Sequence, residues 1–311
     1  MCEKTNTPIL TVSYPAKLDN QERLVEAVKP RLSVIIPCRN SAKFVRDTLQ
    51  TISTQTSKDF ECIVIDGGST DGTQEILREY AWLHTISESD SGYHDALLKG
   101  LDLARGEFVT QCCMSDGYIS NSWFETAIKS LDENPDCDLV WGYPQSMSEK
   151  GNLERIAYPQ MRIRKPLGRN RMFLHYLVSG FHLPEINYVV RRSAIDACFR
   201  RQPGTVPDNL DFESWLEFEN NFHESGRLTL PVSEVVSFGR RHDGSLTNTQ
   251  SDQNRKYWER FQTRRRVTRR KLLQDTKWTR SGFILRANLL RAATVNLISE
   301  AKVRIRQDGR N

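Results

Sequence analysis

The segment 62–73 constrains the fold of this chain more than any other stretch. Residues 63–65 are all β-branched, as in a strand that is covered on both faces, and the strand ends at Asp66 in a glycine-rich turn. Residues 70–73 then offer an N-cap and predict a helix over 74–80. Open α/β sheets bind nucleotides where an acidic residue at the carboxyl end of a strand faces a helix N-terminus, so this segment predicts a nucleotide site.

A second predicted strand precedes this one by about the length of a crossover helix. Residues 32–37 form an apolar run that Pro37 ends, and apolar residues recur at helical spacing over 44–52. Strand, helix and strand make a βαβ unit, which implies a parallel sheet. Neither strand is followed by GxGxxG or GxxxxGKS/T, so the sequence predicts a nucleotide fold without a dinucleotide or P-loop signature.

Three fragments carry a resemblance to a known family. They are residues 34–40, residues 64–73 with the sequence DGGSTDGT, and residues 87–100. In this order and spacing they resemble the family 2 glycosyltransferases of the GT-A fold, over roughly residues 31–245. The resemblance implies an α/β fold with a mostly parallel, Rossmann-like sheet flanked by helices. Beyond it, the residue pattern predicts a C-terminal helical extension.

The extent of the resemblance, together with the residue pattern outside it, divides the chain. Residues 1–30 are expected to be an N-terminal extension, and residues 251–311 a basic amphipathic helical tail. Residues 31–250 between them form the expected GT-A glycosyltransferase domain. Its donor half covers 31–120, and its acceptor half covers 121–250.

A site for a nucleotide-diphosphate sugar is expected at the ends of the first strands. Many relatives carry a second acid directly after Asp66, and that acid contacts the nucleobase; here Gly67 takes its place. Asn is frequent in the family where Leu98 stands, so one polar contact is missing. An ordinary turn with capping carboxylates is the alternative interpretation of the segment around Gly92. The donor-binding residues that the resemblance implies are Pro37, Asn40, Asp66, Asp90, Asp95, Lys99, Ser115 and Asp116.

The same resemblance implies a divalent metal, Mn²⁺ or Mg²⁺, as cofactor. The family has an Asp/Asn-x-Asp signature that holds the metal against the diphosphate; here Met114 replaces the first member and Asp116 keeps its carboxylate. One or two carboxylates suffice for Mg²⁺ when phosphates and water complete the octahedron. His242, in a His-x-Gly-Ser turn, is the second expected ligand and favours Mn²⁺. Alternatively, Asp116 caps the helix that starts at Trp123, and His242 is structural.

Asp211 is the expected catalytic base. Aligned on Trp215 and Leu216, it falls where the family has this residue, and Glu213 follows two positions later. Both acids lie in the first turn of a predicted helix, where the helix dipole favours the ionised form; capping of that helix is the alternative role. The family implies inverting transfer of a sugar from a nucleotide-diphosphate sugar to an acceptor hydroxyl, in polysaccharide or glycolipid assembly.

Two other functions remain as alternatives. Met114 is compatible with a catalytically impaired nucleotide-sugar-binding protein that acts as an assembly partner, although Asp66, Asp116, Asp211 and His242 are all present. A nucleotidyltransferase on a similar sheet is disfavoured, because the first strand is not followed by a Gly-rich loop that carries Arg or Lys.

The positive charge of the chain is concentrated at its C-terminal end. Residues 255–311 contain 17 Lys and Arg against 4 Asp and Glu, a net +13, whereas the remaining residues carry −8. Apolar positions near helical spacing alternate there with cations, which fits a helix in the plane of an anionic membrane. A solvated helix docked on the domain is the alternative, and nucleic acid is not an expected partner. The expected partners are the nucleotide-sugar donor, a saccharide or lipid-linked acceptor and this membrane surface.

The expected location is cytoplasmic, with a peripheral position on the inner face of the cell membrane. No secretory signal is recognisable, and no apolar run approaches the roughly 20 residues that span a bilayer. The seven cysteines form no CxxC pair, and we expect reduced thiols.

Overall fold

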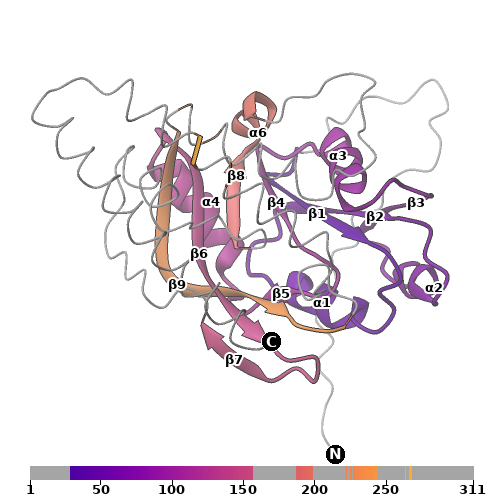
Figure 1. Cartoon of the computed structure of the whole chain (residues 1–311). Helices are drawn as coiled ribbons and strands as arrows, with labels where there is room; N and C mark the ends of the chain where they lie inside the picture. Colours follow the sequence, from indigo (N-terminus) through magenta and orange to yellow (C-terminus); the bar gives the residue numbers. More distant parts are fainter. Residues whose placement is uncertain are drawn as a thin grey trace, which may run out of the picture.

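The computed structural model describes residues 29–156, 187–198, 222, 225, 227–243, 263, 266 and 267 (Figure 1). Nine strands in this part of the chain form one sheet. Their bounds are β1 Leu32–Cys38, β2 Phe60–Asp66, β3 Leu83–Ser87, β4 Phe108–Gln111, β5 Gly117–Tyr118, β6 Cys137–Met147, β7 Leu153–Ile156, β8 Tyr188–Arg191 and β9 Leu228–Arg240. The order across the sheet is β3-β2-β1-β4-β8-β6-β9-β5, and β7 pairs with β6.

The first four strands are parallel. β1 pairs with β2 on one side and with β4 on the other, and β2 pairs with β3. All seven residues of β1 are buried, which explains its nearly unbroken apolar run. The strands are connected by the helices α1 (Val45–Ser53), α2 (Thr73–Leu77) and α3 (Tyr93–Leu103). The βαβ unit predicted from the sequence is confirmed.

The other half of the sheet is mixed. β8 runs antiparallel to β4 and β6, whereas β9 runs parallel to β6 and antiparallel to β5. Helices α4 (Trp123–Glu133) and α6 (Arg192–Cys198) belong to this half. The sheet is therefore parallel mainly from β1 to β4, and not over most of its width. An apolar pattern predicts that a strand exists but not its direction, which depends on the neighbours it meets.

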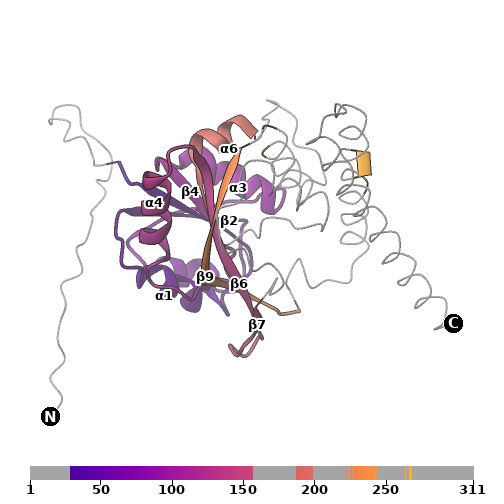
Figure 2. The ribbon, with the colours of Figure 1, turned by 90° about the vertical axis from the view of Figure 1, so that its left-hand side faces the viewer.

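Two apolar layers cover the faces of the sheet. On one face α3 and α6 pack on Ile35, Ile63 and Ile65, and on the other α1, α2 and α4 pack on Val34 and Ile36. Figure 2 shows α1 and α4 together on one side of the sheet. Each fully buried aliphatic side chain contributes about 1.5–3 kcal/mol, so these layers fix the strand ends that carry the polar loops.

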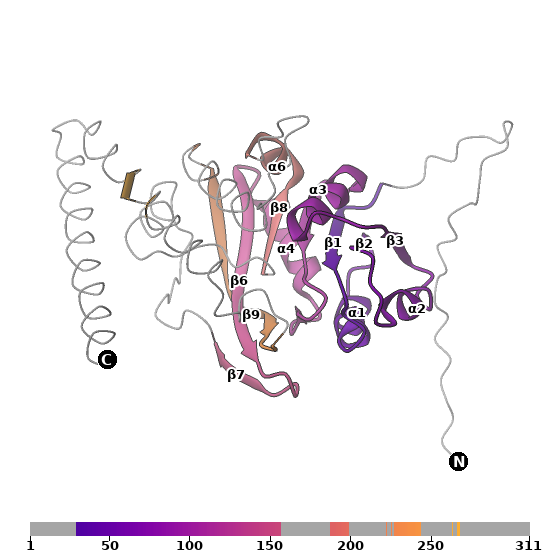
Figure 3. The same ribbon diagram turned by 45° about the vertical axis from the view of Figure 1, so that its right-hand side comes forward.

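Strands β6 and β7 form a hairpin that extends beyond the rest of the sheet (Figure 3). At its tip the N–H of Gly151 donates to the carbonyl of Ser148 over 3.0 Å, and the N–H of Ser148 donates to the carbonyl of Asn152 over 2.8 Å. Gly151 has a φ of 86°, which glycine adopts without strain. The hairpin brings Glu149 into an ion pair with Lys43, two residues before α1.

Among the described residues, no helix is long and apolar enough to cross a membrane. The cysteines in this part of the chain are free thiols, at Cys38, Cys62, Cys112, Cys113, Cys137 and Cys198.

Candidate active site

Hydrogen bonds join the loops that follow β1 and β2. Asn40, with a φ of 49°, accepts the N–H of Thr70 at its Oδ1 over 3.0 Å, and its own N–H donates to Ser69 Oγ over 2.7 Å. The N–H of Ala42 donates to Asp71 Oδ2 over 3.0 Å. The two loops therefore form one polar unit at the carboxyl edge of the parallel strands, where the sequence predicts the nucleotide site.

Asp66 lies inside this unit and is fully buried. Its Oδ2 accepts the hydroxyl of Ser87 over 2.6 Å and the N–H of Ser69 over 3.2 Å, and its Oδ1 accepts the hydroxyl of Ser69. Pro37 is buried in the neighbouring strand β1. Asp66 thus holds the end of β2, the end of β3 and the following loop together, and its direct contact with a nucleoside stays a prediction.

The carboxylate of Asp90 lies over Gly67. A Cβ placed on Gly67 would come within 2.6 Å of Asp90 Oδ2. Asp90 is held there by the N–H of Gly92, which donates to its Oδ1 over 3.0 Å. A carboxylate from the loop after β3 therefore occupies the space beside Gly67, and its contact with a donor stays a prediction.

Asp95 and Lys99 contact each other on α3. Lys99 Nζ lies 2.7 Å from Glu88 Oε1 and 3.3 Å from Asp95 Oδ2, and the N–H of Ser91 donates to that same Oδ2 over 3.1 Å. The hydrogen bond with Glu88 raises the pKa of Lys99 above its usual value. The structure thus contains the expected turn, in which carboxylates accept backbone N–H groups. Contacts of Asp95 and Lys99 with a donor stay predictions.

Asp116 lies between β4 and β5, half-buried. Its Oδ1 accepts the N–H of Arg240 over 2.8 Å, and its carbonyl accepts the hydroxyl of Thr48 over 2.7 Å. Burial raises the pKa of Asp116 to about 7, although the hydrogen bonds from Arg240 and Ser115 oppose this shift. No hydrogen bond from a described residue reaches its Oδ2, so this oxygen is the one available to a ligand.

Asp116 does not cap the helix that starts at Trp123. The N-cap of α4 is Ser122, which makes no side-chain capping hydrogen bond, and Asp116 binds the end of β9 instead. The capping alternative is therefore wrong, because β9 returns to this loop from far along the chain. Met114 is 2% exposed and packs in the apolar layer with α1 and α4.

His242 lies two residues beyond the end of β9 and packs on α1. Its ring centroid is 4.7 Å from that of Phe44, with the planes at 45°. Partial burial, together with the positive charges of Arg240 and Lys43, lowers the pKa of His242 and favours the neutral imidazole, although Glu149 acts in the opposite direction. A neutral imidazole is the form that binds metal ions.

The described residues contain no group of three or more His, Cys, Asp or Glu side chains that could hold a metal ion. The two expected ligands are the carboxylate of Asp116, at the loop after β4, and the imidazole of His242, beyond the end of β9. This donor set fits a divalent ion that takes most of its ligands from a diphosphate and from water. The chemistry of these two residues is therefore compatible with the expected cofactor.

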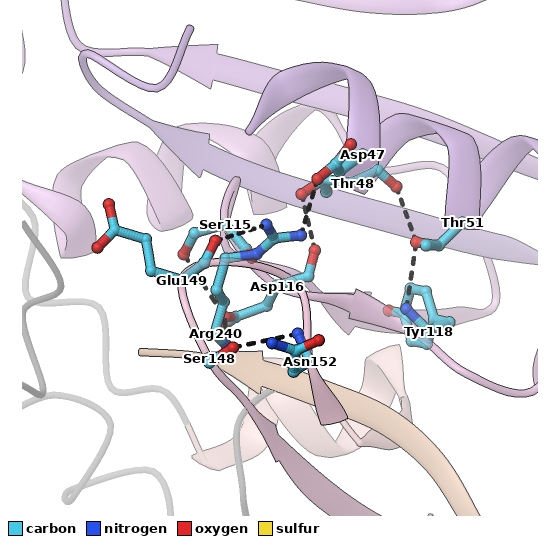
Figure 4. Close-up of polar contacts among 10 residues, drawn as sticks. All are labelled: Asp47, Thr48, Thr51, Ser115, Asp116, Tyr118, Ser148, Glu149, Asn152 and Arg240. Carbon is cyan, nitrogen blue, oxygen red and sulfur yellow. Dashed lines mark hydrogen bonds and ion pairs between the residues drawn. The ribbon is translucent and has the colours of Figure 1, made fainter. Parts of the chain in front are cut away.

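Sequence reasoning missed the residues that hold Asp116 in place (Figure 4). Arg240 reaches it from β9, while Thr48 and Thr51 reach its loop from α1 through the Asp116 carbonyl and the Tyr118 N–H. Arg and Thr at these positions carry no local pattern. The adjacent basic pair Arg240-Arg241, directly before the His-x-Gly-Ser turn, is the one signal that could have indicated a role for Arg240.

Some expected features lie outside the described residues. They are the catalytic base Asp211, its neighbour Glu213, the N-terminal extension over 1–28 and nearly all of the basic tail.

The sheet order and the polar loops at its carboxyl edge define an α/β protein of the GT-A class. A solved structure of TarS from Staphylococcus aureus, in complex with UDP-GlcNAc, matches with a TM-score of 0.58 and 17% identity over 84% of this chain and 72% of that chain. The mannosyltransferase PcManGT from Pyrobaculum calidifontis, in complex with GDP-Man and Mn²⁺, matches with a TM-score of 0.50 and 17% identity over 90% and 81%. At such identities the likeness concerns the fold, and the predicted fold class is confirmed.

The sequence model of glycosyl transferase family 2 matches residues 33–198. This segment is more than half of the 311 residues and includes both the joined loops and Asp116. The chain belongs to glycosyl transferase family 2. The family inferred from the three sequence fragments is thereby confirmed.

Two curated relatives bear the same class name. A PGL/p-HBAD biosynthesis glycosyltransferase of Mycobacterium bovis is 33% identical over 118 residues, which are 36% of this chain and 46% of that protein. An uncharacterized glycosyltransferase of Rickettsia typhi is 27% identical over 243 residues, 73% of this chain and 69% of that protein. The match thus spans less than half of the mycobacterial relative, and what that protein makes is not carried over to this chain.

Proposed function

We propose that this protein is an inverting glycosyltransferase that moves a sugar from a nucleotide-diphosphate sugar to an acceptor hydroxyl. The observation that carries the proposal is the position of Asp116, whose Oδ2 is uncommitted among the described residues, at the sheet edge that also bears the joined loops after β1 and β2. Family membership and the nucleotide-sugar complexes of the two structural neighbours support it.

The loops would hold the nucleoside, and Asp90 is the acidic group best placed to meet its base. Asn40 and Asp66 fix the two loops before any ligand arrives, because their hydrogen bonds lie within the protein. A site that is already ordered loses little conformational entropy on binding. The buried network around Asp66 would thus act by preorganisation, and exposed groups would make the contacts.

Asp116 and His242 would hold the divalent metal that the family and the Mn²⁺ in one neighbour's complex suggest. When bound, such an ion neutralises the charge that develops on the leaving diphosphate, which is commonly worth several kcal/mol. Met114 is buried in the core and takes no part in this ligand set.

Asp211 would take the proton from the acceptor hydroxyl. The acceptor oxygen then attacks the anomeric carbon, and the bond from this carbon to the diphosphate oxygen breaks on the opposite face, so that the configuration inverts. A positioned base typically contributes about 10²–10⁴-fold to the rate. Asp211→Asn should therefore remove turnover and leave donor binding intact.

The test is release of nucleoside diphosphate from a panel of UDP-, GDP- and dTDP-sugars, with Mn²⁺, Mg²⁺ or EDTA. We expect metal-dependent release from one donor and its loss in Asp116→Ala. Asp136→Ala is the matched control, since Asp136 is exposed and precedes β6 at the opposite edge of the sheet. Nucleotide binding without release, even with a lipid extract as acceptor, would contradict the proposal and favour the catalytically impaired assembly partner.

We also propose that the enzyme works in polysaccharide or glycolipid assembly, on a saccharide or lipid-linked acceptor at the cytoplasmic face of a membrane. The net charge of +13 over residues 255–311 supports attraction to anionic lipid. An enzyme bound to the membrane surface through this charge would encounter a lipid-linked acceptor by diffusion in the plane of the membrane.

A further inference from the structure

Arg240, at the end of β9, is a buried cation that the proposed reaction does not use directly. Its side chain is 6% exposed, and its Nη2 lies 2.9 Å from Asp47 Oδ2 on α1. Burial of an arginine is costly unless its charge is paired and its donors are satisfied. Here the charge is paired with Asp47, and each of the three side-chain nitrogens has an acceptor in another segment of the fold.

The guanidinium of Arg240 reaches three different segments (Figure 4). Besides the ion pair with Asp47, its Nε donates to the carbonyl of Ser115 over 3.1 Å and its Nη1 to the carbonyl of Glu149 over 3.5 Å. The loop before β5, helix α1 and the β6–β7 hairpin are therefore joined through one planar group. Only arginine among the side chains offers several donors in such a fixed fork.

Two aromatic rings restrict the guanidinium further. Its carbon lies 5.0 Å from the ring centroid of Phe44 and 5.7 Å from that of Phe238. Phe44 also packs against His242, so the same ring contacts both Arg240 and an expected metal ligand. Cation–π contacts of this kind strengthen where water is excluded.

The backbone of Arg240 completes the arrangement. Its N–H donates to Asp116 Oδ1 over 2.8 Å. Its side chain donates to the carbonyl of Ser115, the residue that precedes Asp116. Thr48 holds the Asp116 carbonyl over 2.7 Å. The backbone at Ser115 and Asp116 is thus held from two sides, and the Asp116 carboxylate is bound at Oδ1, with Oδ2 left for a ligand.

We propose that Arg240 is a positioning residue that fixes the loop of Asp116, and through it the diphosphate end of the donor site. This inference rests on the proposed function. Arg240 acts through Asp116, since each of the three nitrogens of its buried side chain already donates a hydrogen bond within the protein, to Ser115, Glu149 or Asp47. Outer partners of a metal ligand typically contribute about 10–100-fold in affinity, and we expect an effect of this size.

The first measurement is amide hydrogen exchange in the segment 112–118, in the full chain. Arg240→Gln removes the ion pair with Asp47 and the guanidinium hydrogen bonds to Ser115 and Glu149, but it retains the backbone hydrogen bond to Asp116. We therefore expect faster exchange in this segment. Arg240→Lys keeps the charge beside Asp47 and should restore part of the protection. Arg241→Gln is the matched control, because Arg241 is exposed and pairs with Glu154 on the hairpin. Unchanged exchange in Arg240→Gln would overturn the inference.

The second measurement is binding of UDP and GDP by calorimetry at a series of Mn²⁺ concentrations. Arg240→Gln should weaken metal-dependent binding about 10–100-fold, and Arg241→Gln should leave it unchanged. In an Asp116→Ala background, Arg240→Gln should cause no further loss, because a residue that acts through Asp116 has nothing left to position. Additive losses would overturn the inference and indicate a direct contact of Arg240 with the ligand.

If Arg240→Gln does not fold, Asp47→Asn replaces it as the test variant, since it frees one end of the guanidinium and should give a smaller effect in the same direction. A wild-type protein that binds no nucleoside diphosphate and releases none from any donor would contradict the proposed function. The exchange measurement would still decide whether Arg240 fixes the loop, so the two failures are distinguishable.

Discussion

At the scale of single residues, buried side chains shape the candidate donor site. Asp66 is fully buried and binds Ser69 and Ser87, although an acidic residue at this position suggested a direct ligand contact from sequence alone. Asp90 comes from a different loop and lies beside Gly67. Because Gly67 has no side chain, the carboxylate of Asp90, from the loop after β3, can lie beside it.

Gly67→Ala tests this arrangement. The added Cβ would lie 2.6 Å from Asp90 Oδ2, so the carboxylate must move. We expect weaker nucleotide binding, with a loss of stability below the roughly 1–3 kcal/mol of core overpacking, because the group that must move is the end of a flexible side chain. Gly239→Ala is the control, because a Cβ there meets no atom within 4 Å. Equal denaturation midpoints and equal nucleotide affinities for the two variants would refute the assignment.

His94 makes the stability of the protein depend on pH. It is 5% exposed in the first turn of α3, and burial lowers its pKa to about 4, against the opposing effect of Asp95. In the unfolded chain the imidazole binds a proton at about pH 6.5. The free energy of unfolding is therefore unaffected by His94 above pH 6.5, and it decreases as the pH falls from 6.5 towards 4, because only the unfolded chain then binds the proton. The loss should reach on the order of 3 kcal/mol.

Urea unfolding at pH 7 and at pH 4.5 measures this dependence. The decrease in unfolding free energy between these pH values should be smaller in His94→Gln than in the wild type. His84→Gln, at an exposed position of β3, should keep the wild-type decrease. A decrease in His94→Gln as large as in the wild type would assign the pH dependence to other groups.

At the scale of elements, the sequence predicted those whose apolar pattern is set locally. The expected positions of β1, β2, α1 and α4 agree with the structure. β9 covers Leu228–Arg240, and its length is set by its pairing along most of β6. β5 was missed, since its two residues are a strand only through their pairing with Phe238 and Ser237. Pairing with strands that are distant in sequence thus determines the strand boundaries that the local sequence pattern does not.

The candidate site also has a part that the local sequence determines and a part that depends on distant contacts. The loops after β1 and β2 were predictable, because each follows its strand directly and carries a recognisable motif. The partners of Asp116 were not, since Thr48 and Arg240 lie 68 and 124 residues from it along the chain. Arg240 and Asp47 are 193 residues apart. Contacts of this kind leave no local trace in a single sequence.

Helix α1 contributes to stability through one face. Leu49 on this helix is fully buried against the sheet, whereas the adjacent Gln50 is exposed. Leu49→Ala should lower the free energy of unfolding by about 2–5 kcal/mol, through lost burial and a cavity. Gln50→Ala should change it by less than about 0.5 kcal/mol. Denaturant titration of both variants checks this, and similar midpoints would show that α1 does not pack as described.

At the scale of the whole molecule, one sheet joins the two halves predicted from the sequence. Strands β1 to β4 come from the donor half, and β6, β8 and β9 from the acceptor half. Asp116 belongs to the first half, yet Arg240 from the second holds its carboxylate. The candidate site therefore depends on the complete sheet.

The charge distribution leads to a prediction for the full chain. The wild type should sediment with vesicles of phosphatidylglycerol at low salt, and far less at high salt or with phosphatidylcholine alone. Replacement of six cations in the tail by Gln should abolish this, and replacement of six exposed cations elsewhere should not. The tail cations are Arg264, Arg265, Arg266, Arg269, Arg270 and Lys271. Sedimentation of the tail variant equal to that of the wild type would exclude the tail as the attachment site.

The position of β9 between β6 and β5 has a consequence for biosynthesis. Strands β1, β2 and β4 are close in sequence and can pair while the chain is still emerging from the ribosome. The loop of Asp116 must wait until about residue 240 has been translated, because β5 pairs with β9 and Asp116 binds the β9 terminus. A nascent chain would thus form the joined loops after β1 and β2 well before it could form the loop of Asp116.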